Sequence, residues 1–397
     1  MSHRALSVFT LLGAMSGLAV HAGDIKTVFV IAMENHNWTQ PTGITGSPQQ
    51  VYQNPAAPFI NGLVNGTALA VIGGNVVNIS QHVSYATAYH NVLATPTGNN
   101  PSIHPSEPNY IWAEGGSNFG VLNDVDPYVV QTGGVVNNQN TPLHLSDLLT
   151  LAGRTWKSYQ EDIDLTTDTN SKLTNVVLPQ SQWTVPLTSF AGRFDAGSPN
   201  NAYNGSNQYN YAAKHNPMVF FTDTNGGNNS TASNPLSSHY APLQQLATDL
   251  ANNTVADYNW ITPNQYNDMH STLSGGFMGL GGDAANIKQG DNFLSQGVPT
   301  IMASDAYKNH GVIIIWWDES EGDGVGNEND FNHTIGEIVI SDHAHKNVNG
   351  LPYASPLNFT HSSDLRTMQE LFKLKSRFLA DAANALDLSD LFEPGAF

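Results

Sequence analysis

Two apolar runs that lie far apart in the sequence constrain the fold of this chain more than any other feature. Residues 28–33 and 313–317 have the length and β-branched content of strands that are buried on both faces. Each run stops abruptly on side chains that carry oxygen: Glu34 and Asn35, then Asp318 and Glu319. Because ligands of open α/β sheets bind beyond the carboxyl ends of the strands, these side chains are predicted to surround one metal ion.

The rest of the chain alternates candidate strands with candidate helices. This alternation predicts an α/β fold with a mostly parallel central sheet flanked by helices. The predicted strands are 26–32, 68–72, 217–222, 257–262, 311–317 and 335–341. The predicted helices are 145–152, 241–250, 291–307 and 362–374, the last capped by Ser362 or Ser363.

Long segments rich in Asn, Gly, Ser and Thr interrupt this pattern near 118–141, 163–210 and 223–238. They are expected to be polar loops or insertions around a single large domain at 23–397. Residues 1–22 have a short basic start, an apolar run and a Val-His-Ala end, as in a cleaved signal peptide. The alternative is an uncleaved N-terminal anchor. Cleavage predicts a secreted or periplasmic protein without a transmembrane anchor.

The charge balance and the cysteine count exclude several classes of function. The formal net charge is −19 at pH 7, which disfavours binding to nucleic acid or to anionic membranes. An anionic substrate would need a cation to bring it in. The chain has no cysteine, so disulfides, thiolate metal sites and a cysteine nucleophile are excluded.

A serine within the segment 103–110 is the candidate nucleophile. Ser106 follows a proline and precedes a predicted helical turn, where free backbone N–H groups favour an anion. A nearby metal would lower the pKa of its hydroxyl further, and Asn109 could offer an amide donor to a bound oxyanion. The alternative is that Ser106 is only a helix cap.

Several other polar residues lie next to predicted elements. Asp268 and His270 follow the strand 257–262 and could face one cavity, although an ordinary loop histidine would look the same. His215, beside Lys214, could meet an anion or could belong to a solvated helix end. His333 and His361 are candidate proton donors to a leaving group.

Taken together and in order, these segments resemble the phosphoesterase family of bacterial phospholipases C and secreted acid phosphatases, which has an alkaline-phosphatase-like core. The matching blocks are VFVIAMENHNW (28–38), HPSEPNYIWAEGG (104–116), LSDLLTLAGRTWKSYQED (145–162), YAAKHNP (211–217), WITPNQYNDMHS (260–271), GDNFL (290–294), IIIWWDESEGDG (313–324) and THSSDLRTMQELF (360–372). The smaller acid-phosphatase branch is the more similar one.

The resemblance implies a role for each matching position. The metal ligands would be Glu34, Asn35, Asp318 and Glu319, with Asp268 added to the set. Ser106 would be the nucleophile, and the phosphoryl group would be held by Asn109, His215 and His270. His333 and His361 fall where the family often has histidine. The chain departs from the family at His36 and Trp38, and at Glu107, which adds negative charge beside Ser106.

The favoured hypothesis is a metal-dependent phosphoesterase that hydrolyses phosphate esters through a phosphoserine intermediate, with Mg²⁺, Mn²⁺, Ca²⁺ or Zn²⁺ as the cofactor. One alternative is a phospholipase C, whose apolar access face could include Trp38, Trp112, Trp156 and Phe331. A third hypothesis is a non-enzymatic binding protein stabilised by structural Ca²⁺. Such sites draw ligands from one segment, whereas here they come from distant strand ends, which favours catalysis.

Overall fold

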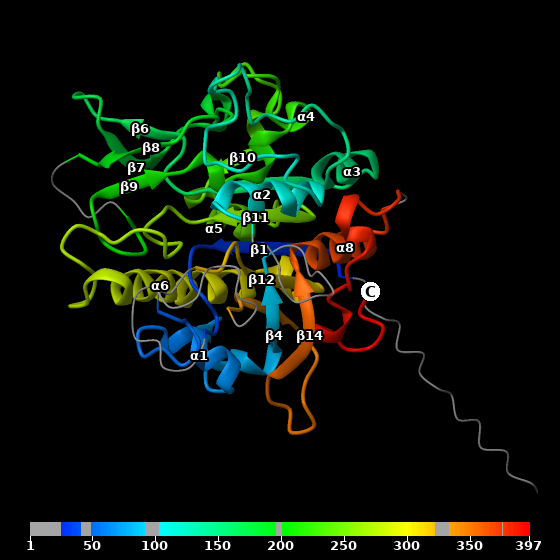
Figure 1. The fold of residues 1–397 in the computed structure, drawn as a ribbon. Coiled ribbons are helices and arrows are strands. Elements are labelled where there is room, and N and C mark those ends of the chain that lie inside the picture. Colours follow the sequence, from blue (N-terminus) through cyan, green and yellow to red (C-terminus); the bar gives the residue numbers. More distant parts are fainter. Residues whose placement is uncertain (1–24, 41–48, 92–102, 196–200, 322–332, 375) are drawn as a thin grey trace, which may run out of the picture.

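A computed structural model describes residues 25–40, 49–91, 103–195, 201–321, 333–374 and 376–397, so the expected signal peptide lies outside the described residues. The core is one eight-stranded sheet (Figure 1). Its strand order is β10 (Tyr240–Pro242), β5 (Trp156–Gln160), β11 (Tyr258–Thr262), β1 (Thr27–Met33), β12 (Gly311–Trp317), β13 (Glu337–Ser341), β4 (Val83–His90) and β14 (Tyr353–Thr360). All neighbours pair in parallel except β13, which runs antiparallel to both β12 and β4.

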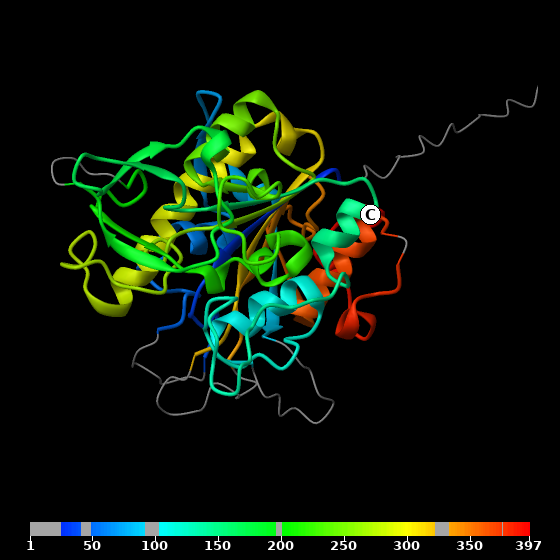
Figure 2. The ribbon, with the colours of Figure 1, turned by 90° about the horizontal axis from the view of Figure 1, so that it is seen from above.

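Helices cover both faces of this sheet. On one face lie α1 (Pro58–Asn65) and α6 (Gly282–Met302); α2 (Ser106–Gly115), α3 (Leu145–Leu151) and α8 (His361–Leu371) group together on the other (Figures 1 and 2). The shorter helices are α4 (Thr222–Asn225), α5 (Gln244–Asn252) and α7 (Asp305–Lys308). Because both faces are covered, every residue of β12 is buried, as its continuous apolar sequence requires.

The sheet confirms the predicted α/β class and several of its strands. The predicted strands 26–32, 257–262, 311–317 and 335–341 correspond to β1, β11, β12 and β13. The strand at 68–72 exists as β2 (Leu69–Ile72), but it forms a separate hairpin with β3 (Asn75–Asn78). The strand predicted at 217–222 is wrong, because 217–220 form a 3-10 turn that leads into α4. Its apolar residues are fully buried, and a short buried run has no period that separates a strand from a turn.

Several elements begin or end elsewhere than predicted. The helix predicted at 291–307 is wrong in its extent, since α6 begins at Gly282, ends at Met302 and is followed by the separate α7. The cap predicted for the last helix is also wrong: Thr360 caps α8, and Ser363 completes the capping box. The strands β4, β5 and β14 were not predicted, because their polar residues hide the strand pattern.

The polar insertion at 163–210 contains two hairpins, β6 (Leu165–Thr167) with β7 (Leu173–Val177) and β8 (Phe190–Arg193) with β9 (Gln208–Tyr211). The insertion at 118–141 is a loop that returns to α2, where Asn137 donates to the Glu107 carboxylate at 2.6 Å. Within the described ranges, no helix is long and apolar enough to cross a membrane.

A buried charged cluster ties α2, α3 and α4 together. The two ring nitrogens of His144 lie 2.9 Å from a Glu114 oxygen and 2.8 Å from an Asp223 oxygen. Glu114 also accepts from the backbone and hydroxyl of Ser146, and the imidazole stacks on Phe221. Burial opposes the charge on His144, but the two carboxylates outweigh burial and raise its pKa to about 9.

This cluster predicts a stability that falls as the pH rises. Folding raises the pKa of His144 from about 6.5, so its contribution is complete below pH 6.5 and is lost as the pH passes through about 9. The shift corresponds to a contribution of His144 to the free energy of unfolding on the order of 3 kcal/mol. Glu114→Gln should lower that pKa and flatten the decline between these pH values, measured by denaturant unfolding. A slope equal to that of the wild type would contradict the assignment.

Candidate functional site

The parallel pairing of β1 and β12 brings the two predicted acidic segments together. Met33 is in register with Trp317, so Glu34 and Asp318 leave adjacent strand ends, and both are completely buried. The backbone N–H of Asn35 donates to an Asp318 carboxylate oxygen at 3.1 Å. Asn35 has a φ of 39°, a left-handed conformation that few residues other than glycine adopt. The first sequence expectation, that these strand ends meet, is therefore confirmed.

Ser106 reaches this edge from the first residue of α2. Its Oγ lies 3.1 Å from Glu34 Oε2, 3.2 Å from Glu319 Oε1 and 3.4 Å from Asn35 Oδ1. Pro105, and not Ser106, occupies the cap position, so the simple capping alternative does not hold. One turn further along α2, Tyr110 donates to Glu34 Oε1 at 2.6 Å. The helix thus presents a buried hydroxyl to side chains from two strands.

A second group of side chains surrounds the other carboxylate oxygen of Glu34, the one that Tyr110 contacts. His215 stacks on Tyr110, and its nitrogens lie 3.1 Å from Glu34 Oε1 and 3.2 Å from Asp268 Oδ2. These distances are those of ion pairs, but neither nitrogen is aligned for a hydrogen bond to a carboxylate. Burial, followed by Lys214 and His270, lowers the pKa of His215 well below its usual value, so the ring is neutral.

The buried carboxyl groups resist ionisation. Burial raises the pKa of Glu34 to about 8; Lys214 partly offsets this effect, and Glu319 adds to it. Burial and the neighbouring Glu34 also raise the pKa of Asp318 and of Asp268. Concentrated negative charge without enough positive charge is typical of a site that a cation or a catalytic function completes.

Glu107 does not add the negative charge that its sequence position suggests. The side chain is fully buried beneath Asn137, and burial raises its pKa to about 9. The raised pKa disfavours the charged form near neutral pH, so Glu107 adds little of the negative charge that its sequence position suggests.

The donor atoms suit a hard divalent cation. One buried carboxylate oxygen of Asp318 and one of Asp268 have no hydrogen-bond partner. In the described part of the chain, no three side chains drawn from His, Asp and Glu form a ready metal-binding group by themselves. The amide oxygen of Asn35 and the hydroxyl of Ser106, which lie among Glu34 and Glu319, would supply the further oxygen ligands.

The other predicted site residues, His270, Asn109 and His333, differ in how close they lie to the acidic side chains. His270 lies beside His215, with ring centroids 5.8 Å apart, and its backbone N–H binds Asp268. The amide of Asn109 donates to the Ile103 carbonyl at 2.7 Å and approaches Glu319 at 3.3 Å. The described contacts of His333 place its main chain against the ring of His90 and do not bring it to Ser106.

His361 does not have the free imidazole expected of a proton donor. Its Nε2 lies 2.6 Å from the carbonyl of Asp318, and its Nδ1 lies 2.9 Å from the indole N–H of Trp316. Burial lowers its pKa to about 3, so the ring is uncharged at neutral and mildly acid pH. Its engaged nitrogens argue against the sequence-based role of proton donor.

Sequence reasoning missed two residues of this site, His104 and Tyr110. His104 lies 2.8 Å from Glu319 Oε2, and Tyr110 binds Glu34. Lys214, noted in the sequence only as part of a basic pair that could meet an anion, pairs at 3.0 Å with Asp124 from the 118–141 loop. His104 lies two residues before Ser106 in the same matching block. The spacing of Tyr110 four residues after Ser106, on one helix face, is a signal that could have identified it.

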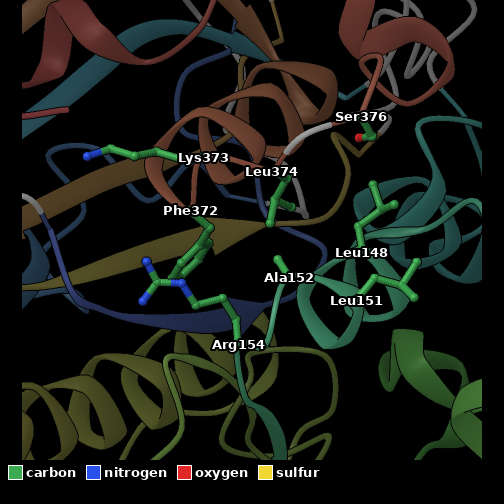
Figure 3. A pocket seen from close by; sticks show the side chains of 8 residues that line it. All are labelled: Leu148, Leu151, Ala152, Arg154, Phe372, Lys373, Leu374 and Ser376. Atoms are coloured by element: carbon green, nitrogen blue, oxygen red, sulfur yellow. The ribbon is translucent and has the colours of Figure 1, made fainter.

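A pocket of about 630 Å³ lies away from this chemistry (Figure 3). It is lined by Leu148, Leu151, Ala152, Arg154, Phe372, Lys373, Leu374 and Ser376. The first residue of α8 contacts Asp318, whereas the pocket is found just beyond its last residue, Leu371. In Figure 3 the Arg154 guanidinium lies beside Phe372, 5.9 Å from the ring centre.

Comparison with known proteins is consistent with this geometry. A model of the Phosphoesterase family matches residues 99–375. A probable acid phosphatase of Kluyveromyces lactis is 27% identical over 229 residues, which are 57% of this chain and 40% of the relative. A phosphate-repressible acid phosphatase of Penicillium chrysogenum is 23% identical over 316 residues, 79% of this chain and 60% of the relative. The chain spans 36–60% of the length of the curated relatives it matches.

Solved structures with a similar arrangement include the lipoteichoic acid synthase LtaP from Listeria monocytogenes, with a TM-score of 0.46 and 9% identity over 91% of this chain and 75% of that chain. An alkaline phosphatase superfamily protein from Vibrio parahaemolyticus has a TM-score of 0.44 and 10% identity over 93% of this chain and 72% of that chain. Similarities this weak say nothing about the function of this chain.

The electrostatics of the cluster predict that removing one buried acid stabilises the protein without metal. Asp318→Asn keeps the oxygen that accepts from Asn35 but removes a charge close to Glu34 and Glu319. With chelator at pH 8, the free energy of unfolding should rise by at least about 1 kcal/mol, because one unit of pKa shift equals about 1.4 kcal/mol. Asp257→Asn, at a partly exposed carboxylate paired with Arg154, is the control and should show no gain. Equal stability of wild type and Asp318→Asn would refute this account.

Proposed function

The chain belongs to the phosphoesterase family, and we propose that it hydrolyses phosphate esters as an acid phosphatase does, with Ser106 as the nucleophile. The observation that carries this proposal is the buried Ser106 hydroxyl, which lies 3.1–3.4 Å from oxygens of Glu34, Asn35 and Glu319. A hydroxyl in this position at the start of a helix is suited to bind and attack an electrophilic phosphorus centre.

The cofactor in this proposal is one divalent metal ion, Mg²⁺, Mn²⁺, Ca²⁺ or Zn²⁺. Its ligands would be Glu34, Asn35, Asp318 and Glu319, with Asp268 beside them. When bound, the ion would favour the alkoxide form of Ser106 and offset the charge of the phosphate. The oxygen donors support this assignment, and so does the crowding of acidic side chains, which raises the pKa of Glu34 and Asp318 when no cation is bound.

The reaction then has two displacements. The Ser106 oxygen attacks phosphorus while its proton passes to a neighbouring carboxylate, Glu34 or Glu319; the bond from phosphorus to the ester oxygen breaks, and the alcohol leaves with a proton. Water next attacks the phosphoserine and gives up a proton, the bond from phosphorus to Ser106 breaks, Ser106 regains a proton, and inorganic phosphate leaves. His104, a quarter exposed and 2.8 Å from Glu319, is better placed to donate the first proton than the buried His361.

Lys214 supplies positive charge in a chain that has little of it. Its ammonium is mostly buried, 3.0 Å from Asp124, and lies close enough to lower the pKa of Glu34 and Asp318. We assign it to the binding of phosphate oxygens, together with Asn109, His215 and His270.

The described aromatic residues suggested for a phospholipase C access face do not form an exposed surface. Trp38, Trp112 and Trp156 are buried in the core, and Phe331 lies outside the described residues. A monoester substrate is therefore favoured. Secretion is a further proposal that rests on the signal-like residues 1–22.

Removal of the nucleophile or of the metal should abolish activity. Ser106→Ala should lower kcat for a chromogenic phosphate monoester by at least about 10³-fold, because no other group could form the covalent intermediate. A chelator should have a comparable effect, reversed by added Mg²⁺ or Mn²⁺. Ser295→Ala, on α6, is the control serine. Turnover of phospholipid micelles but not of the monoester would transfer the assignment to a phospholipase C.

Loss of the buried cation should weaken phosphate binding more than it lowers kcat. Lys214→Gln should raise KM for the monoester and the inhibition constant of inorganic phosphate by about 10- to 150-fold, as expected when one charged hydrogen bond worth ~1.5–3 kcal/mol is lost. Lys157→Gln removes another partly buried lysine, paired with Asp249, and is the matched control. Unchanged phosphate inhibition in Lys214→Gln would exclude this role.

A further inference from the structure

His361 connects the acidic edge of the site with the buried interior of the sheet. It is the first residue of α8 and directly follows β14, the edge strand. Its Nε2 nevertheless lies 2.6 Å from the carbonyl oxygen of Asp318, which follows β12. Two strands, β13 and β4, separate β12 from β14 in the sheet, so this contact joins parts that the sheet itself does not hold together.

The neighbours of the ring decide which nitrogen carries the proton. The indole N–H of Trp316 can only donate, and it lies 2.9 Å from His361 Nδ1. The same N–H also lies 3.2 Å from the Tyr89 hydroxyl, so the Asp318 carbonyl settles the tautomer together with Trp316. A carbonyl oxygen can only accept, and it lies 2.6 Å from Nε2, so the ring proton lies on Nε2 and Nδ1 accepts. That proton is donated to the Asp318 carbonyl. The Tyr89 hydroxyl also lies 2.8 Å from Nδ1, and it donates to Asp364.

The start of α8 also holds the helix that carries the nucleophile. Ser362, next to His361, accepts a hydrogen bond at 2.8 Å from the indole of Trp112 in α2. Its own hydroxyl donates to Asp381. One helix end thus contacts both the main chain of the acidic pair and the helix of Ser106, through two adjacent residues that are fully buried.

We propose that His361 is a positioning residue: Trp316 helps to fix it as the Nε2–H tautomer, and its bond to the Asp318 carbonyl holds the carboxylates of Asp318 and Glu319 in place for the cation. The proposal rests on the proposed function, because it assumes that these carboxylates bind a metal. It replaces the proton-donor role that the sequence suggested. A donor that orients a ligand-bearing segment commonly changes metal affinity by 10–100-fold when removed.

Two amide variants test the position of the donated proton. In His361→Gln the side-chain amide can reach the place of Nε2 and bind the Asp318 carbonyl; in His361→Asn it can reach only the place of Nδ1. Titration calorimetry with Mn²⁺ should give His361→Gln an affinity within about 3-fold of the wild type and His361→Asn an affinity at least about 10-fold weaker. Thermal unfolding confirms that both variants are folded.

The kinetic readout separates positioning from proton donation. If His361 only positions, His361→Gln keeps kcat and the shape of the pH profile, and His361→Asn recovers activity at higher Mn²⁺ concentration. Equal loss of kcat in both variants, with wild-type Mn²⁺ affinity, would make His361 a proton donor and overturn the proposal. Wild-type Mn²⁺ affinity in His361→Asn would also overturn it.

A measurement without metal keeps this inference separate from the proposed function. In ¹⁵N-histidine-labelled protein, two-bond ¹H–¹⁵N correlations identify the His361 ring as the signals lost in His361→Gln. They should show the proton on Nε2, and a proton on Nδ1 would refute the proposal even if the wild type bound no Mn²⁺. Absence of Mn²⁺ binding and of phosphatase activity in the wild type, with the Nε2–H tautomer present, would instead contradict the proposed function.

Discussion

The parallel pairing of β1 with β12 is the interaction on which the rest of the site depends. Because Met33 is in register with Trp317, the next residues of both strands, Glu34 and Asp318, emerge side by side at one edge of the sheet. Helices cover both faces, so these carboxylates cannot reach bulk water and remain completely buried. The same packing that stabilises the apolar strands therefore concentrates negative charge at their ends.

The surrounding groups accommodate that charge in three ways. Tyr110 and the backbone of Asn35 donate hydrogen bonds to the carboxylates, and Lys214 supplies a buried positive charge. The third way is protonation: burial raises the pKa of Glu34 to about 8, so this carboxyl group readily takes up a proton and loses its charge. None of these groups satisfies every oxygen: one carboxylate oxygen of Asp318 and one of Asp268 have no hydrogen-bond partner, although the latter lies 3.2 Å from His215 Nδ1. Stability is thus reduced where the proposed chemistry takes place.

Rigidity comes from residues outside the acidic cluster. The C-terminal half of α2 meets the start of α8 through Trp112 and Ser362, and His361 links α8 to the Asp318 main chain. Two residues after Trp112, α2 is also fixed by the buried pair of Glu114 and His144. The C-terminal half of the helix that carries Ser106 is consequently held, while the Ser106 hydroxyl at its start contacts the side chains that follow two strands.

The sequence by itself determined the α/β class, the two central strands and the oxygen-bearing residues at their ends, because continuous apolar runs that end on acids require buried parallel strands. It also singled out Ser106, although not the contacts that support it.

Only the tertiary structure decided which residues lie together: β5, β4 and β14 carry polar residues that are satisfied by distant partners, and 217–222 is a buried turn. It also changed the interpretation of Glu107, whose pKa is raised by burial although Asn137 opposes this, and of His361, whose ring nitrogens contact Trp316 and the Asp318 carbonyl. Those partners come from remote segments, and local sequence holds no record of them.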